Sequence, residues 1–130
     1  MDESAKKMTI VLRTDKNMRK GKMVAQGGHA IEYNIISEAR EVEEGLLIPK
    51  TSIIYSWLTG ESHKKSVLGI DGEKALLELY NQVKEGGLVC SLVLDSGLTE
   101  FNGIPTYTAV AIGPDFPDKI DPFTKDLKPL

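Results

Sequence analysis

The stretch RTDKNMRKGKMVAQGGHAIEYN, residues 13–34, contains the change from strand to helix that decides the fold. It overlaps an aliphatic run, Met8–Thr14, that is typical of a buried strand. A short basic loop follows. Apolar side chains then recur near helical spacing over residues 21–44, and Gly45 is predicted to end that helix; the recurring positions are Val24, Ala25, Ile31, Ile35, Ala39 and Val42. Ionisable groups at a strand–helix junction often form ligand sites in α/β proteins, so this junction is the first candidate site.

The rest of the chain continues the alternation of strands and helices. Thr51–Leu58 fits either a strand or the start of a helix. Further elements are predicted as a strand at Ser66–Ile70, a helix at Glu73–Lys84 with Asp71 as its N-cap, and strands at Leu88–Leu94 and Thr106–Ile112. About 11 residues join the last two strands, too few for a helical crossover, so we expect an antiparallel pair. Gly113-Pro114 is expected to close the last strand before an acidic tail. The order predicts an α/β domain with a mixed sheet.

Length and composition are those of one globular domain. The chain has 130 residues, of which 41% are apolar and 27% charged. Residues 1–7 are expected to be flexible and residues 8–130 to form the domain. The single cysteine, Cys90, lies in the apolar run LVCSLVL and reads as a core residue in a reducing compartment. No apolar stretch has the roughly 20 residues of a membrane span, and the N-terminus does not resemble a signal peptide, so a cytoplasmic protein is expected.

Charge is unevenly distributed. The net charge of −3 argues against a general nucleic-acid binder. However, Lys16, Arg19, Lys20 and Lys22 fall within seven positions, and His63-Lys64-Lys65 forms a second basic spot. A protein with one basic edge can still bind RNA by that edge.

Three polar residues of the first helix share one narrow stripe, because Lys22, Gln26 and His29 are four and three positions apart. A lysine in the first turn opposes the helix dipole, so Lys22 either points to solvent or meets an anion. A lone helical histidine is more often packed or exposed than catalytic, and no second histidine completes a metal site. Gly27 and Gly28 allow close packing of the helix on the sheet, room for a ligand backbone, or both.

Asp95 ends the strongest strand, in LVLDSGLTEF. Such an acid commonly starts a turn, which Ser96-Gly97 fits, and the same position suits a catalytic carboxylate. Thr99 and Thr108 are, taken alone, ordinary threonines. Neither a Walker motif nor a nucleophile elbow is present in the sequence. Residue types alone therefore predict an α/β domain whose basic strand–helix junction can hold an anion.

The separated motifs together resemble the type 2 peptidyl-tRNA hydrolases, the archaeal and eukaryotic class. Arg13-Thr14-Asp15 through His29-Ala30 is similar to the N-terminal signature of that family. Asp95-Ser96-Gly97-Leu98-Thr99 resembles its DAGxT element, with serine in place of alanine. Thr108 through Pro114, followed by Ile120-Asp121, Thr124 and Leu127-Lys128, resembles its ending. The resemblance covers roughly residues 8–128.

The resemblance implies hydrolysis of the ester between a peptide and tRNA, with no metal or organic cofactor. It also implies a four-stranded mixed sheet flanked by helices in three α/β/α layers, and a homodimer. The active centre would contain Lys22, Asp95, Thr99 and Thr108, with His29 nearby as an alternative base and Thr106 as a rival to Thr108. Phosphates of tRNA would meet Lys16, Arg19, Lys20, Lys64 and Lys65. Two other functions stay open: a catalytically silent relative that holds tRNA or another phosphate ligand, and an aminoacyl-tRNA deacylase.

Overall fold

A five-stranded mixed sheet forms the centre of the molecule, in the order β5-β6-β1-β4-β7. The computed structural model describes residues 5–98 and 100–130. β1 (Lys7–Arg13) runs parallel to β4 (Lys65–Ile70) and antiparallel to β6 (Thr106–Asp115). β6 also pairs with β5 (Cys90–Asp95), and β4 with β7 (Lys128–Pro129), both antiparallel. The antiparallel pairing expected for the last two long strands is therefore confirmed.

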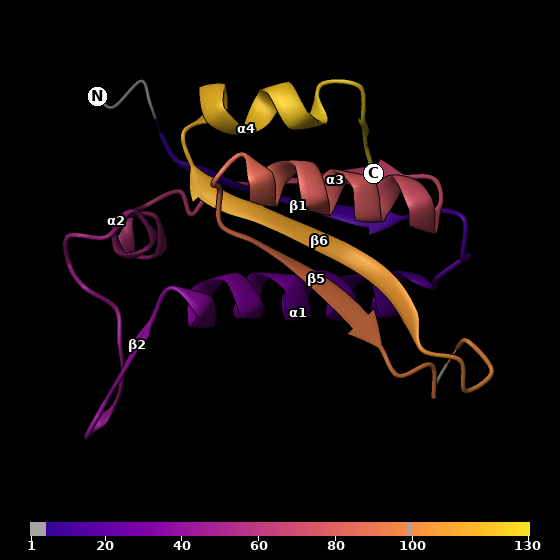
Figure 1. The fold of residues 1–130 in the computed structure, drawn as a ribbon, viewed down its shortest axis with the longest axis horizontal. Coiled ribbons are helices and arrows are strands. Elements are labelled where there is room, and N and C mark those ends of the chain that lie inside the picture. The colour runs from indigo at the N-terminus through magenta and orange to yellow at the C-terminus, as the bar shows by residue number, and fades with distance from the viewer. Residues whose placement is uncertain (1–4, 99) are drawn as a thin grey trace.

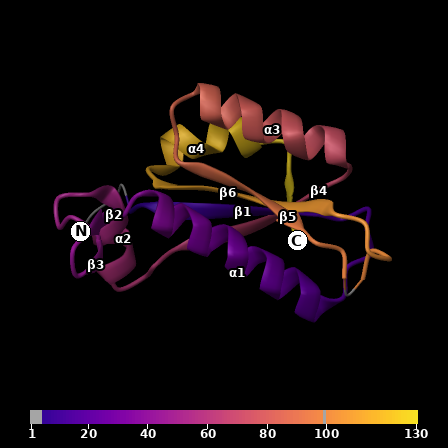
Figure 2. The same cartoon turned by 60° about the horizontal axis from the view of Figure 1, so that its bottom comes forward.

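Helices cover both faces of the sheet. α1 (Lys20–Ser37) and α2 (Ile53–Thr59) lie on one face, and α3 (Glu73–Glu85) and α4 (Pro117–Thr124) on the other (Figures 1 and 2). Each face has its own apolar core. Buried residues on the α1 face include Met8, Ile10, Leu12, Trp57, Val93 and Ala109, and those on the α3 face include Val11, Leu76, Val83, Val110, Ile112 and Ile120. Successive side chains of β1 and β6 alternate between the two cores, so both faces of the sheet are buried and the layering is α/β/α.

The expectation of a four-stranded sheet is wrong, because the sheet has five strands. The acidic tail forms regular structure. Its residues form α4, which starts with Pro117 at its first position, and then β7, which pairs with Leu68 and Gly69 of β4. β6 also continues through Gly113-Pro114 to Asp115. The tail therefore adds a helix to the layer that contains α3 and a short fifth strand to the edge of the sheet.

The first helix ends earlier than its apolar periodicity predicts. α1 stops at Ser37, where the backbone N–H groups of Glu38 and Ala39 donate to the carbonyls of Ile35 and Ile36, three residues back, as in a 3₁₀ turn. Residues 40–47 form an exposed hairpin of β2 (Arg40–Val42) and β3 (Gly45–Leu47), and Gly45 supplies a positive φ there instead of ending a helix. The fully buried side of α1 is also small or polar, consisting of Gln26, Gly27, Ala30 and Asn34.

The structure shows where α2 and α3 begin, which the sequence left open for α2 and predicted differently for α3. The ambiguous segment Thr51–Leu58 contains α2, whose N-cap Ser52 accepts a hydrogen bond from the backbone N–H of Tyr55. The cap of α3 is Gly72, with a φ of 108°, and not Asp71. The backbone N–H of Gly72 donates to Asp15 at 3.1 Å, so an acid from the first strand–helix junction takes the place of a local cap.

Candidate active site

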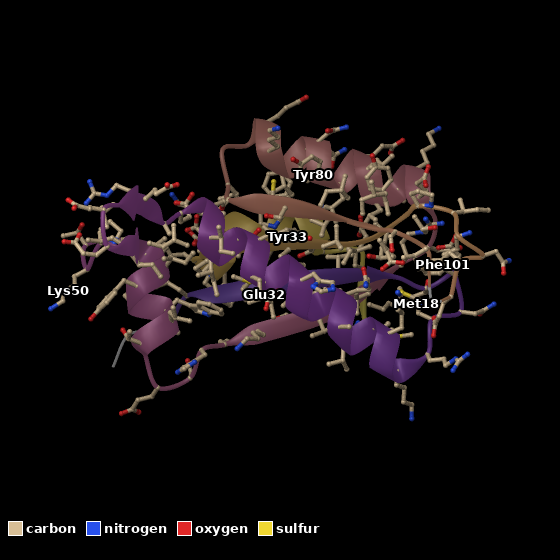
Figure 3. The ribbon with its side chains drawn as sticks, turned by 90° about the horizontal axis from the view of Figure 1, so that it is seen from below. Met18, Glu32, Tyr33, Lys50, Tyr80 and Phe101 are labelled. Atoms are coloured by element: carbon tan, nitrogen blue, oxygen red, sulfur yellow. The ribbon has the colours of Figure 1, made fainter. Side chains whose placement is uncertain are left out.

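The C-terminal ends of β1 and β5 meet the N-terminus of α1 at one end of the sheet. There Lys22, in the first turn of α1, lies 2.9 Å through its Nζ from Oδ1 of Asp95, the last residue of β5. Both side chains are only 12% exposed. Figure 3 shows this end of the molecule, where Met18 and Phe101 are labelled. The structure therefore brings together two residues that are 73 positions apart in the sequence.

Asp95 is held by hydrogen-bond donors on both of its oxygens. Besides Lys22, Nε2 of Gln26 donates to Oδ1 at 3.2 Å, and the backbone N–H of Gly97 donates to Oδ2 at 2.9 Å. Burial alone raises the pKa of this carboxyl, but the bonds from Lys22, Gly97 and Gln26 outweigh burial and hold the pKa below its usual value. Asp95 is therefore ionised at neutral pH.

Gln26 also belongs to this cluster, and no role for it was predicted from the sequence. It lies one turn after Lys22 on the same stripe of α1 and is buried. Its Oε1 accepts a hydrogen bond from the Thr108 hydroxyl while its Nε2 donates to Asp95. A buried glutamine on the stripe that carries Lys22 was the available signal, because buried amides need partners on both atoms.

Thr108 reaches Gln26 because β6 contains a bulge. Val93 pairs with Ala109, but Leu94 pairs with Tyr107, so Thr108 is an extra residue in the β6 strand. Regular alternation would turn Thr108 to the α3 face, where Val110 lies. The bulge turns it to the α1 face. Its rival Thr106 pairs with Asp95 in the strand register, but its hydroxyl donates to the carbonyl of Ile104.

Phe101 and Gly97, which follow β5 in the chain, contribute further contacts to the cluster. The ring of Phe101 lies with its centroid 5.6 Å from Nζ of Lys22, a cation–π contact. Gly97 has a φ of 83°, and its carbonyl accepts from the backbone N–H of Gly103 at 2.8 Å. Thr99, which the resemblance assigns to the active centre, lies outside the described residues.

His29 lies farther along α1 with its side chain half exposed. Its Nδ1 is 3.7 Å from Glu32, and its ring stacks on Tyr33 with the centroids 6.4 Å apart. These contacts are on its own helix, two turns from Lys22. His29 therefore lies on the same stripe of α1 as Lys22 and Gln26, but it is not bonded to Asp95.

The basic residues form two groups and not one patch. Lys16, Arg19 and Lys20 are exposed beside the cluster, and Nε of Arg19 lies 3.4 Å from Glu100. Lys64 and Lys65 are at the other end of the sheet, because Lys65 pairs with Met8 at the start of β1. Lys65 also lies 5.1 Å from the centroid of the Trp57 ring. At 3.3 Å per strand residue the two groups are about 15–20 Å apart.

Arg13 and Asp15 lie on the opposite face of the sheet. The guanidinium of Arg13 donates to both oxygens of Asp15, at 3.1 and 2.7 Å, and also to the carbonyl of Tyr107 at 3.1 Å. The hydrogen bond from Arg13 is the main cause that lowers the pKa of Asp15 and raises that of Arg13. This pair links β1 to the bulge of β6 and, through Gly72, to the start of α3. We interpret it as a structural support for the cluster.

Two other kinds of site are absent from the part of the chain that the structure describes. No group of three or more histidine, cysteine, aspartate or glutamate side chains there could hold a metal ion. Within the same residues, no helix is long and apolar enough to cross a membrane. Cys90 is half buried against α3, and burial raises the pKa of its thiol, as suits a packed residue.

The chain is similar to known proteins over almost its whole length. Residues 6–130 match the family model described as peptidyl-tRNA hydrolase PTH2. A peptidyl-tRNA hydrolase of Methanocaldococcus jannaschii is 42% identical over 124 residues, which cover 95% of this chain and 99% of the relative. One of Methanothermobacter thermautotrophicus is 39% identical, with 95% and 99% covered. A solved structure of a protein of unknown function from Agrobacterium tumefaciens is similar in fold, with a TM-score of 0.51 at 16% identity, covering 97% of this chain and 98% of that one.

Proposed function

The chain belongs to the PTH2 family of peptidyl-tRNA hydrolases, and we propose that its reaction takes place at Lys22 and Asp95. It hydrolyses the ester that joins a peptide to the 3′ end of tRNA, which returns the tRNA to translation. The observation that supports this location is the 2.9 Å pair of an ammonium and an ionised carboxylate, enclosed beside a basic loop. An ester hydrolase needs a group that directs water and a positive group for the oxyanion, and this pair supplies both.

In the proposed mechanism Asp95 accepts a hydrogen bond from the attacking water. As the water oxygen bonds to the ester carbonyl carbon, one proton passes to Asp95 and the carbonyl oxygen becomes negative. The ammonium of Lys22 stabilises that oxygen. When the tetrahedral intermediate collapses, the bond to the ribose 3′ oxygen breaks, and Asp95 returns its proton to that oxygen. A low pKa makes Asp95 a weak base, so orientation of the water is its larger contribution.

Gln26 and Thr108 have a positioning role in this proposal. Thr108 holds the oxygen of the Gln26 amide, so that the amide N–H points at Asp95. The carboxylate then has one oxygen fixed by Lys22 and Gln26 and the other by Gly97. Thr99 remains a proposed member from the resemblance. His29 remains a candidate base that would need to reach the substrate from one side of the cluster.

The tRNA would approach from the basic loop. Lys16, Arg19 and Lys20 are exposed next to Lys22, where the acceptor end must lie for its ester to reach Asp95. Contacts to phosphates are independent of sequence, as suits an enzyme that acts on many tRNAs. Lys64 and Lys65, at the far end of the sheet, would contact a more distant part of the tRNA.

We also propose a homodimer in the cytoplasm. An apolar groove of about 660 Å³ lies between α1 and β4, lined by residues that include Met23, Val24, Ile31, Val67 and Leu130. Val24, Val67 and Leu130 are exposed, and an exposed apolar patch of this kind often marks a contact between subunits. A cytoplasmic location follows from a substrate made by translation. Sedimentation of the protein and of Val24→Asp tests the dimer, since the variant should sediment as a monomer.

The decisive experiment measures release of N-acetyl-aminoacyl groups from tRNA. We expect Lys22→Ala and Asp95→Asn to lose most activity while retaining the fold, and Lys74→Ala, which removes an exposed lysine on α3, to keep it. Equal activity in all variants would refute the location of the site. An inactive wild type that binds tRNA would favour the silent relative. Faster cleavage of aminoacyl-tRNA with a free amine would favour the deacylase.

A further inference from the structure

β5 has a free edge that ends at the candidate active site. In the described sheet it is the outermost strand and pairs only with β6, and its last residue is Asp95. Figure 1 views the molecule from this side, with β5 in front of β6 and α1 and α3 below and above it. An edge strand exposes unpaired N–H and C=O groups that can accept another strand. We propose that the peptide part of the substrate binds along this edge as an added strand.

The direction of β5 suits the substrate. The ester carbonyl belongs to the C-terminal residue of the peptide and must lie at Asp95, where β5 also ends. The peptide would therefore run parallel to β5. Val89 accepts a ladder bond from Gly113, so by alternation the backbone groups of Cys90 and Leu92 point to the open edge. A strand of six residues offers room for about five or six peptide residues.

Recognition through the backbone also suits the reaction. An added strand is held by main-chain hydrogen bonds, which do not depend on the side chains of the peptide. A hydrolase that releases interrupted translation products meets peptides of every sequence. This inference rests on the proposed function and adds to it the place where the peptide is held.

One side of α1 forms a wall along the same path. Gln26 bonds to Asp95 at one end of β5, and Asn34 donates at 2.8 Å to the carbonyl of Gly113, the residue opposite Val89, at the other. Tyr33 lies between these anchors and, with its eleven-residue spacing from Lys22, on the stripe of the active centre. Figure 3 places Tyr33 on the β5 side of α1. The Tyr33 ring, which stacks on the ring of His29, is partly exposed and can contact peptide side chains.

The charges on α1 favour a peptide over RNA at this place. The basic loop with Lys16, Arg19 and Lys20 lies on the other side of Asp95. The last turn of α1 has no basic residue, Glu32 is 68% exposed, and Glu38 follows the helix. Phosphates would be repelled here and attracted at the loop. The ester at Asp95 would thus divide the substrate, with tRNA toward the loop and peptide along β5.

A series of substrates tests the edge directly. One tRNA is charged with N-acetyl-oligoalanine of one, two, four or six residues, and kcat/KM is measured for each. We expect a rise of roughly tenfold that levels off near six residues, since each added hydrogen bond contributes modestly. Two sets of N-methylated peptides give the control, one methylated on the odd-numbered amides and one on the even-numbered amides. Only one of these sets carries its methyl groups on the amides that face β5. Methylation in that set should abolish the gain, and methylation in the other should not.

The outcomes separate the two proposals. An active enzyme with no dependence on length, or with equal effects of both methylated sets, would overturn the peptide edge and leave the proposed function intact. That result would reassign the edge to RNA or to a second copy. A protein that cleaves none of the substrates would instead contradict the proposed function.

Variants of α1 test the wall. With leucine peptides, Tyr33→Ala should reduce the gain in kcat/KM with peptide length several-fold relative to the wild type. Leu46→Ala, which removes an exposed apolar side chain from the distant hairpin, is the matched control. Melting temperatures of both variants report on folding. If Tyr33→Ala lowers the rate equally for short and long peptides, Tyr33 does not contact the peptide and the wall is wrong.

Discussion

The hydroxyl of Thr108 donates a hydrogen bond to the side-chain oxygen of Gln26, across 82 positions of sequence. This contact fixes the orientation of the amide, because its oxygen is taken by Thr108 and its nitrogen must then face Asp95. One buried amide therefore connects the bulge of β6 to the acid at the end of β5. The orientation of Asp95 depends on a residue that itself need not touch the substrate.

Replacing Gln26 tests this connection. In Gln26→Glu a second carboxylate takes the place of the donor that lies 3.2 Å from Asp95, so the pKa of Asp95 should rise by like-charge repulsion. We expect the acid limb of the kcat/KM profile to move to higher pH and activity at neutral pH to fall roughly tenfold or more. Gln82→Glu on the exposed side of α3 serves as control. An unchanged profile in Gln26→Glu would show that the amide does not control Asp95.

Lys22 should control the ionisation of Asp95. Burial raises the pKa of this carboxyl and the bond from Lys22 lowers it, so Lys22→Gln leaves burial less opposed. We expect the pKa of Asp95 to rise in Lys22→Gln, measured by carbon NMR of the carboxyl during an acid titration. Hydrolysis should fall roughly 100-fold with loss of the positive charge at the oxyanion. Lys74→Gln should leave both unchanged, and an unshifted Asp95 in Lys22→Gln would contradict the ion pair.

The sequence predicted the order of β1, α1, β4, α3, β5 and β6, because their periodicities are local properties. It could not predict the bulge, since alternation counted along β6 turns Thr108 to the wrong face and only pairing with β5 shows the extra residue. Gln26 was visible as a position on the stripe of Lys22. Its role depended on Thr108 and Asp95, which are distant in sequence. The roles of Lys22 and Asp95 came from the family resemblance and not from residue types.

The errors in the fold have similar causes. Periodic apolar residues extended the predicted first helix to residue 44, but Val24 and Ala25 are exposed and the helix packs through Gly27 and Ala30. Small residues facing a sheet carry little periodic signal. The sequence predicted no helix or strand in the acidic tail, yet Ile120 is fully buried and anchors α4 on the sheet. One buried residue per turn was enough for that helix.

Asp15→Asn should weaken the fold in a pH-dependent way. The bond from Arg13 lowers the folded-state pKa of Asp15, so its stabilisation is present above the usual value of 3.8 and is lost as the pH falls through the lowered pKa. Arg13 is buried and would lose its closest charged partner. We expect a loss of about 1–3 kcal/mol at pH 7 in urea unfolding. The difference from wild type should shrink below pH 4, and Asp126→Asn, at an exposed site, should show neither effect.

Two glycines should respond in opposite ways to alanine. A Cβ at Gly28 meets nothing within 4 Å, so Gly28→Ala should stabilise α1 by up to about 1 kcal/mol, read from thermal melts. Gly97 has a positive φ, and a Cβ there would collide with the backbone of Ile104. Gly97→Ala should therefore displace the N–H that holds Asp95 and lower activity. Reduced hydrolysis in a stable Gly28→Ala variant would show that Gly28 makes room for the substrate.

The basic loop should determine how salt affects tRNA binding. Each phosphate contact releases counterions, so the slope of log affinity against log salt becomes less steep by about 0.7–0.9 for each contact removed. A variant with alanine at Lys16, Arg19 and Lys20 should bind tRNA more weakly at low salt, and the magnitude of its slope should fall by roughly 2.1–2.7 if all three contact phosphates. The slope is measured by fluorescence anisotropy from about 50 to 300 mM salt. The double variant Lys64→Ala/Lys65→Ala reports separately on the far end of the sheet. Lys74→Ala is the control for a lysine lost elsewhere, and a slope in the triple variant equal to that of the control would show that the loop does not meet the phosphates.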